Sequence, residues 1–211
     1  RGGEPRASPC RGSRPGRDSP RMILMGIDPG LASTGVGVIA RRGEGWRLVH
    51  AAEARTSSTQ PLAERLLRLH DLVASTIAAH HPEALAVEAV FFAKNVKSAV
   101  AMAHGRGAAL LAAAQAGVPV HEYSALEIKQ SVLGSGRATK LQVMQMVKVL
   151  LGLPGLPESD HQADALAAAL AHAYRSRLAR TAAESLDGED DPRAYARQVL
   201  ARAGRRRKRR R

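Results

Sequence analysis

Three acidic residues stand at the ends of apolar segments in this sequence, where a purely structural protein has little reason to place charge. Asp28 closes the apolar run 22–27, and Glu88 closes a second run at 84–87. Asp164 lies in an apolar segment that begins after residue 160. Carboxylates gathered in this way commonly hold hard divalent cations. The pattern favours a metal-dependent nuclease.

Each of these carboxylates also has a structural interpretation. Asp28 precedes Pro29-Gly30, which is ordinary turn chemistry. Glu88 interrupts an apolar strand, where a buried ion pair or a charge that protects a sheet edge would explain it. Neither residue alone decides between the two interpretations, so the case for a site depends on their combination.

The third acidic segment reads as the start of a helix. Ser159 and Gln162 have the spacing of a capping box, with Ser159 as N-cap. Asp160 would then be the first helical residue, where a negative charge suits the helix dipole, and this explains it fully. His161 and Asp164 are three apart and share a helix face, so an imidazole and a carboxylate could bind one cation. A histidine at a helix start is, however, more often simply exposed.

Basic and aromatic side chains near these segments are candidates for contact with DNA. Phe91-Phe92 is the only aromatic pair, and it either packs in the core or stacks on an exposed base. The Gly-Ser-Gly loop at 134–136 lacks the spacing of a P-loop. Cations that could contact phosphate, but could equally be solvated surface charges, are Lys94, Lys97, Arg106, Lys129, Arg137 and Lys140.

Composition supports a polyanionic partner. Of the net charge of +13 in 211 residues, +4 lies in residues 1–21, +6 in 180–211 and only +3 in 22–179. The Arg-rich run 205–211 is either a DNA contact or a solvated tail. The single cysteine, Cys10, excludes an intrachain disulfide, and no apolar stretch reaches transmembrane length, so we expect a cytoplasmic protein without a membrane partner.

The elements that must position the acidic residues alternate between strands and helices. We predict a disordered extension at 1–21, one nuclease domain at 22–179 and a basic, mostly disordered tail at 180–211. The expected fold is a mixed five-stranded α/β sheet, whose first three strands form an antiparallel meander. A helical crossover would bring the first and fourth strands within reach of each other, and with them Asp28 and Glu88. The strands are predicted at 22–28, 34–40, 46–54, 84–88 and 118–123. The helices are predicted from a Ser58 or Thr59 cap to before Pro82, and at 95–116, 124–133, 139–151 and 160–179.

Four short motifs in this order and spacing resemble the RuvC-type Holliday junction resolvases. They are Gly26-Ile27-Asp28-Pro29-Gly30, the segment Glu88 to Asn95, Gly105-Arg106-Gly107, and Ala163-Asp164-Ala165-Leu166-Ala167. The resemblance covers nearly all of 22–175. It implies an RNase H-like fold and a homodimer that cuts two symmetry-related strands of a four-way DNA junction in recombination and repair. It also implies a branch-migration helicase as a further partner.

The resemblance also implies roles for individual residues. Asp28, Glu88 and Asp164 would be catalytic metal ligands, and His161 the fourth, at a position where many members carry Asp; Asp160 is the competitor. Two Mg²⁺ ions, replaceable by Mn²⁺, would hydrolyse the phosphodiester and leave 5′-phosphate and 3′-hydroxyl ends. Phe91 would stack on the opened junction. Lys129 and Lys140 would bind DNA, and we expect the same of Lys94 and Arg106.

Three alternatives stay open at this stage. The chain could be an RNase H-like nuclease that acts on another nucleic acid, or a non-catalytic junction-binding module. An ATP-binding protein of the actin and sugar-kinase type also carries a phosphate loop after a Gly-Ile-Asp strand. That class needs two lobes, and 22–179 is long enough for only one.

Overall fold

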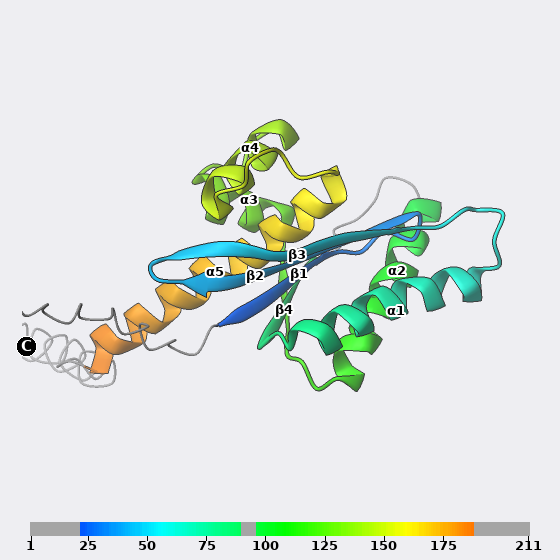
Figure 1. Cartoon of the computed structure of the whole chain (residues 1–211), viewed down its shortest axis with the longest axis horizontal. Helices are drawn as coiled ribbons and strands as arrows, with labels where there is room; N and C mark the ends of the chain where they lie inside the picture. The colour runs from blue at the N-terminus through cyan, green and yellow to red at the C-terminus, as the bar shows by residue number, and fades with distance from the viewer. Residues whose placement is uncertain (1–21, 90–95, 188–211) are drawn as a thin grey trace, which may run out of the picture.

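A mixed five-stranded sheet forms the centre of the structure, a computed structural model that describes residues 22–89 and 96–187 (Figure 1). The strand order is β3-β2-β1-β4-β5. The strands are β1 (Ile23–Asp28), β2 (Ser33–Arg42), β3 (Gly45–Arg55), β4 (Ala84–Glu88) and β5 (Val120–Tyr123). β1, β2 and β3 pair antiparallel, whereas β4 pairs parallel to both β1 and β5. This arrangement confirms the predicted meander and the predicted neighbourhood of the first and fourth strands.

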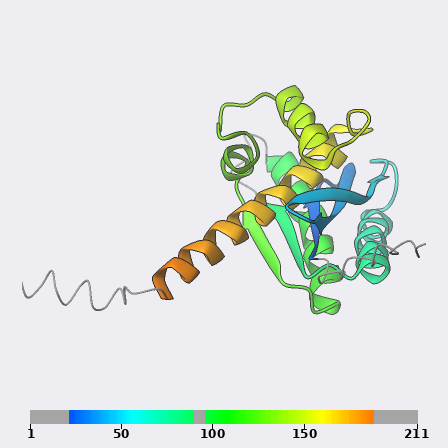
Figure 2. The same cartoon turned by 60° about the vertical axis from the view of Figure 1, so that its left-hand side comes forward.

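Five helices cover the two faces of the sheet (Figures 1 and 2). They are α1 (Leu62–His80), α2 (Val96–Gln115), α3 (Ala125–Leu133), α4 (Lys140–Leu151) and α5 (Asp160–Asp187). The first two pack on the face that carries Met25, Ile27 and Val87. The last three lie on the opposite face, where α5 crosses the middle strands. Period-two alternation along each strand supplies both faces with apolar side chains.

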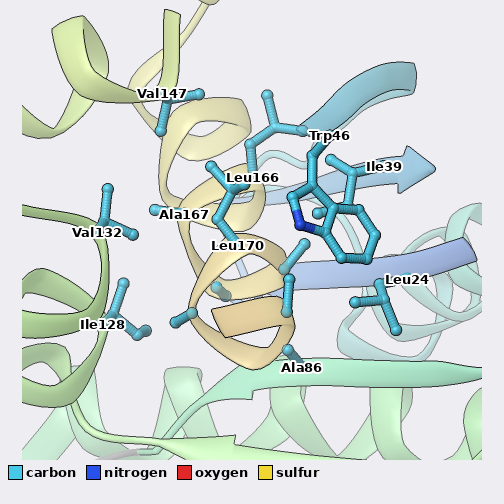
Figure 3. Close-up of a cluster of buried hydrophobic side chains, with 14 of the residues drawn as sticks. Leu24, Ile39, Trp46, Ala86, Ile128, Val132, Val147, Leu166, Ala167 and Leu170 are labelled. Atoms are coloured by element: carbon cyan, nitrogen blue, oxygen red, sulfur yellow. The ribbon is translucent and has the colours of Figure 1, made fainter. Parts of the chain in front are cut away.

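Close packing of α5 on the sheet depends on glycines in β1 and β2. A methyl group at Gly26 would collide with the backbone of Ala165, and one at Gly37 would collide with Leu166. The facing side of α5 is built largely of alanine, so its backbone can approach the strands. Trp46 and Leu170 fill the space beside this contact (Figure 3). The first turn of α5 is therefore held at a fixed height above the ends of β1 and β2.

Two predicted helix boundaries differ from the structure. The predicted hydroxyl cap of α1 is wrong, because the N-cap residue is Pro61 and no side chain caps the helix. Ser57 and Thr59 instead bond to each other in the preceding turn, and the Gln60 side chain accepts the Ser57 N–H. The last helix continues to Asp187, beyond the predicted end at residue 179, and passes the edge of the sheet (Figure 2).

The two shorter helices begin at the predicted positions, where Ser124 and Thr139 are their N-caps. Ser124 and Thr139 each accept the backbone N–H three residues on, and a Glu or Gln side chain at that position bonds back to the cap residue. Across residues 22–89 and 96–187, none of the helices is both long and apolar enough to cross a membrane.

Candidate active site

Two carboxylates leave the sheet side by side. Ile27 of β1 pairs in register with Val87 of β4, so the next residues, Asp28 and Glu88, end two adjacent parallel strands at the same edge. Both belong to the alternation set that faces α5, together with Gly26 and Ala86. The sequence analysis expected a helical crossover to bring Asp28 and Glu88 together, and the parallel pairing of β1 with β4 confirms this.

The first two turns of α5 bring a histidine and a third carboxylate to the same place. The His161 carbonyl stands against Gly35 of β2, where a side chain would collide with it. The His161 Nδ1 lies 2.7 Å from Asp28 Oδ2, a hydrogen bond between residues 133 apart in the sequence. Asp164 lies one turn further along, with its side chain 29 % exposed.

These four side chains surround one cavity of about 360 Å³. Its walls come from α3 and α4, which add two lysines and a few aliphatic side chains. The lining residues are Asp28, Glu88, Ala125, Ile128, Lys129, Lys140, Val143, His161 and Asp164. The cavity lies between the sheet edge and the helices α3, α4 and α5.

The two competitors for the fourth position lie differently. The His161 ring lines the cavity and contacts Asp28, whereas Asp160 is absent from the lining and its side chain is 57 % exposed. Asp160 lies 3.7 Å from the Lys140 ammonium at the mouth. Its position at the first residue of α5 matches the helix-dipole role expected from the sequence.

The carboxylates of the cavity repel one another, because the nearby lysines do not neutralise all of their negative charge. Burial, together with the nearby charges of Asp28 and Asp164, raises the pKa of Glu88 to about 7, against the smaller opposing effect of Lys129 and Lys140. Burial and Asp28 also raise the pKa of Asp164. Such mutual repulsion is relieved when a cation enters.

Lys140 is the cation paired with Asp164. Its ammonium lies 3.6 Å from Asp164 Oδ2, and its side chain is 65 % exposed. Burial alone would lower the pKa of Lys140, but Asp164 and Asp160 outweigh this effect and raise it. A long exposed side chain of this kind can turn from the carboxylate to a phosphate at the mouth of the cavity.

Arg106 of α2 does not lie on an open surface. Its guanidinium donates a hydrogen bond of 2.9 Å to the backbone carbonyl of Glu88 and forms an ion pair with Glu122 of β5. The side chain is 14 % exposed. The predicted phosphate contact would require Arg106 to leave both partners, so in this structure it supports the strand end that carries Glu88.

Two further predicted residues, Phe91 and Lys94, lie outside the residues that the structure describes.

One residue near the site was missed by the sequence analysis. Glu53 of β3 faces α5 in the same cross-strand row as Asp28, and interacts with Ser159 at the start of that helix. Trp46 is buried, and simple alternation along β3 from Trp46 would turn Glu53 away from α5. The pairing of β3 with β2 shifts by one residue opposite Val38 and Ile39, and this irregularity turns Glu53 toward the helix. Nothing in the sequence signals that shift.

The donor set fits a hard divalent cation that also takes ligands from its substrate. Within the described residues, no group of three or more His, Cys, Asp or Glu side chains is arranged to enclose a single ion. Mg²⁺ is usually held by one or two carboxylates, with water and phosphate oxygens completing its shell. Three carboxylates and one imidazole around a cavity open to solvent match that mode, and the raised pKa of Glu88 records the uncompensated charge.

Comparisons with known proteins agree with this geometry. The family model described as "Crossover junction endodeoxyribonuclease RuvC" matches residues 24–172. A relative of that name from Ruminiclostridium cellulolyticum is 45 % identical over 157 residues, covering 74 % of this chain and 95 % of its own.

Solved structures give the same result. The structure of Thermus thermophilus RuvC is 41 % identical, with a TM-score of 0.71, covering 75 % of this chain and 97 % of its own. The structure of T. thermophilus RuvC in complex with Holliday junction substrate is 42 % identical, with a TM-score of 0.72 and coverages of 75 % and 96 %. The sheet flanked by helices is thus the predicted RNase H-like fold.

Proposed function

This chain belongs to the family of RuvC crossover junction endodeoxyribonucleases, and from that premise we propose that the acidic cavity at the ends of β1 and β4 is its active site. The enzyme is an endodeoxyribonuclease that resolves four-way (Holliday) DNA junctions. The observation that carries the proposal is the meeting of Asp28, Glu88, His161 and Asp164, from three separate elements, around one recessed cavity.

The position of each residue in the cavity indicates its role in metal binding. Asp28 lies centrally, beside Glu88 on the next strand and 2.7 Å from His161, so it is the residue best able to contact two bound cations. Glu88 supplies charge from β4 and Asp164 supplies charge from α5. Two Mg²⁺ ions, for which Mn²⁺ can substitute, would activate water and stabilise the leaving 3′ oxygen. Products with 5′-phosphate and 3′-hydroxyl ends follow.

His161 is the fourth ligand in this proposal, supported by its place in the lining of the cavity. An imidazole in place of a carboxylate leaves the site with one less negative charge. Imidazole also suits Mn²⁺ better than Mg²⁺. The Nδ1 contact with Asp28 holds the ring toward the cavity, where its other nitrogen would be available to bind a cation.

DNA contacts complete the proposal. Lys129 and Lys140 line the cavity and would neutralise the phosphate that enters it. Phe91 would stack on a base exposed at the opened crossover, and Lys94 would contact the backbone beside it. Arg106 would act indirectly, by holding the end of β4 in place.

Resolution of a junction requires two cuts related by twofold symmetry, and therefore a second copy of this chain. We place the homodimer contact on the apolar groove between α1 and α2, on the face of the sheet opposite the active-site helices. The groove measures about 580 Å³, and its apolar walls include Leu67 and Leu111, which are 60 % and 54 % exposed. A surface of this kind usually marks an association site.

The dimer contact can be tested apart from catalysis. Leu67→Asp with Leu111→Asp should convert the dimer to a folded monomer in light scattering, with a lower melting temperature because association no longer stabilises the folded state. Val149→Asp is the matched control, because Val149 is 71 % exposed on α4, away from the groove. A double variant that stays dimeric would contradict the placement. A branch-migration helicase is a further expected partner, on the basis of the family resemblance alone.

The substrate decides between this proposal and its two rivals. Wild-type protein is incubated with a four-way junction, a linear duplex of the same sequence and an RNA–DNA hybrid, each with Mg²⁺, Mn²⁺ or EDTA. Paired cuts in the junction alone, and only with metal, support the proposal. Cleavage of the hybrid would favour another RNase H-like nuclease, and tight junction binding without cleavage would favour a binding module.

A further inference from the structure

A fourth carboxylate, that of Glu53, lies beside the active-site carboxylates without lining the cavity. Gly35 of β2 pairs with Asp28 on one side and with Glu53 of β3 on the other, so all three lie in one row across the sheet. Residues paired directly opposite each other face the same way, here toward α5. The Glu53 side chain is only 9 % exposed, although glutamate is seldom buried without a partner.

Glu53 is held by two donors and is stabilised by a third polar group. Its Oε1 accepts a hydrogen bond of 2.5 Å from the Ser33 hydroxyl and one of 2.6 Å from Arg55 Nε. The hydroxyl of Ser159 also favours the ionised form of the carboxylate. Together Arg55, Ser159 and Ser33 lower the pKa of Glu53 to about 2, so the carboxylate is ionised at any working pH. Glu53 therefore does not act as an acid or a base.

Ser159 connects this carboxylate to the first turn of α5. Its hydroxyl accepts the backbone N–H of Gln162 at 3.2 Å, and its carbonyl accepts that of Ala163 at 3.1 Å. One hydroxyl thus caps the helix and also interacts with Glu53 of β3. His161 lies inside the turn that this cap closes, and its ring reaches Asp28. Glu53 is therefore connected, through the cap residue and the first turn of α5, to the histidine of the active site.

We propose that Glu53 is a positioning residue, which fixes the first turn of α5 through Ser159 and so sets the His161 ring against Asp28. The inference rests on the proposed function of the cavity. Gly35 leaves no side chain between the sheet and the helix start, so the helix can approach the strands closely there. The charged hydrogen bonds of Glu53 are stronger than neutral ones and restrict the small shifts that such a contact would otherwise allow. Groups that orient metal ligands typically change metal affinity or activity by about 10–100-fold when removed.

The test measures Mn²⁺ binding by titration calorimetry on the full chain, together with the melting temperature in EDTA. The variants are Glu53→Gln, Ser159→Ala and their combination, with Ser159→Thr as a variant that keeps the hydroxyl. Glu83→Gln, an exposed glutamate on the loop before β4, is the matched control. We expect Glu53→Gln and Ser159→Ala each to weaken Mn²⁺ binding by about 10–100-fold. The double variant should be no weaker than the worse single one, because both act through one interaction.

Other outcomes separate the two proposals. Lower melting temperatures with unchanged Mn²⁺ affinity would overturn the inference, since Glu53 would then serve stability alone. Additive losses in the double variant would also overturn it, because Glu53 would not act through Ser159. Ser159→Thr should bind Mn²⁺ like the wild type, and a loss there would contradict the role of the hydroxyl. If Asp28→Asn bound Mn²⁺ as tightly as the wild type, the cavity would not be the metal site, whatever the role of Glu53.

Discussion

Replacing Glu88 with glutamine should stabilise the metal-free protein while abolishing cleavage. The side chain is half-buried between Asp28 and Asp164, and burial and these two charges raise its pKa from 4.5 to about 7. Each unit of difference in pKa between the folded and unfolded chain corresponds to about 1.4 kcal/mol, which gives about 3 kcal/mol. Because solvent reaches part of the group, we take about 2 kcal/mol as the working value.

The pH dependence of this effect has a definite sign. Below pH 4.5 the carboxyl is protonated in both the folded and the unfolded chain, and Glu88 costs no stability. As the pH rises, the unfolded chain ionises first, so the folded state loses stability until the folded pKa of about 7 is passed. The advantage of Glu88→Gln over the wild type should therefore be absent at pH 4 and complete at pH 8.

Thermal melting in EDTA at pH 8 measures the difference. A chain of this size shifts by about 2–4 °C per kcal/mol, so Glu88→Gln should melt roughly 4–8 °C higher than the wild type. Glu83→Gln, on an exposed residue before the same strand, should change little. Saturating Mn²⁺ should raise the melting temperature of the wild type but not of Glu88→Gln. A metal-free Glu88→Gln protein that melts at or below the wild-type temperature would refute the electrostatic reasoning.

Three further predictions concern the histidine, the aromatic residue and the basic tail. His161→Ala should lose most of the cleavage activity and His161→Asp should retain much of it, whereas a larger loss in Asp160→Ala would mean that the fourth ligand is misassigned. Phe91→Ala should lose about 1–3 kcal/mol of junction stacking with an unchanged melting temperature; a large drop in melting temperature would make it a packing residue. Removing residues 205–211 should weaken binding to every DNA alike and flatten its salt dependence, and a loss confined to junctions would contradict that role.

Much of the fold followed from local signals. Glycines and prolines delimited the strands, and β4 was predicted with the bounds that the structure gives. Helix ends marked by capping residues were also predicted closely, as at Ser124 and Thr139. The start of α1 was not, because Ser57 and Thr59 satisfy each other in a turn rather than the helix N-terminus, a choice that depends on the path of the chain into the helix.

The acidic members of the site were visible because charge at the end of an apolar segment is unusual. Their mutual geometry was not, since the contact between His161 and Asp28 depends on how α5 crosses the sheet over Gly35. Arg106 illustrates the opposite problem. Its type and position made it a candidate for phosphate contact, which stays a prediction. In the structure its guanidinium turns inward to the Glu88 carbonyl, and only tertiary structure decides which side of a helix is covered.

Cleavage and binding by Asp28→Asn test the central claim most directly. Wild type and variant are compared on one synthetic four-way junction in Mn²⁺, with product formation followed on denaturing gels and binding by mobility shift. The account predicts that Asp28→Asn binds the junction about as tightly as the wild type and forms no cleaved product, because the substitution keeps the shape of the site and removes the charge at its centre. Cleavage by Asp28→Asn at a rate close to that of the wild type would contradict the assignment of this cavity as the active site.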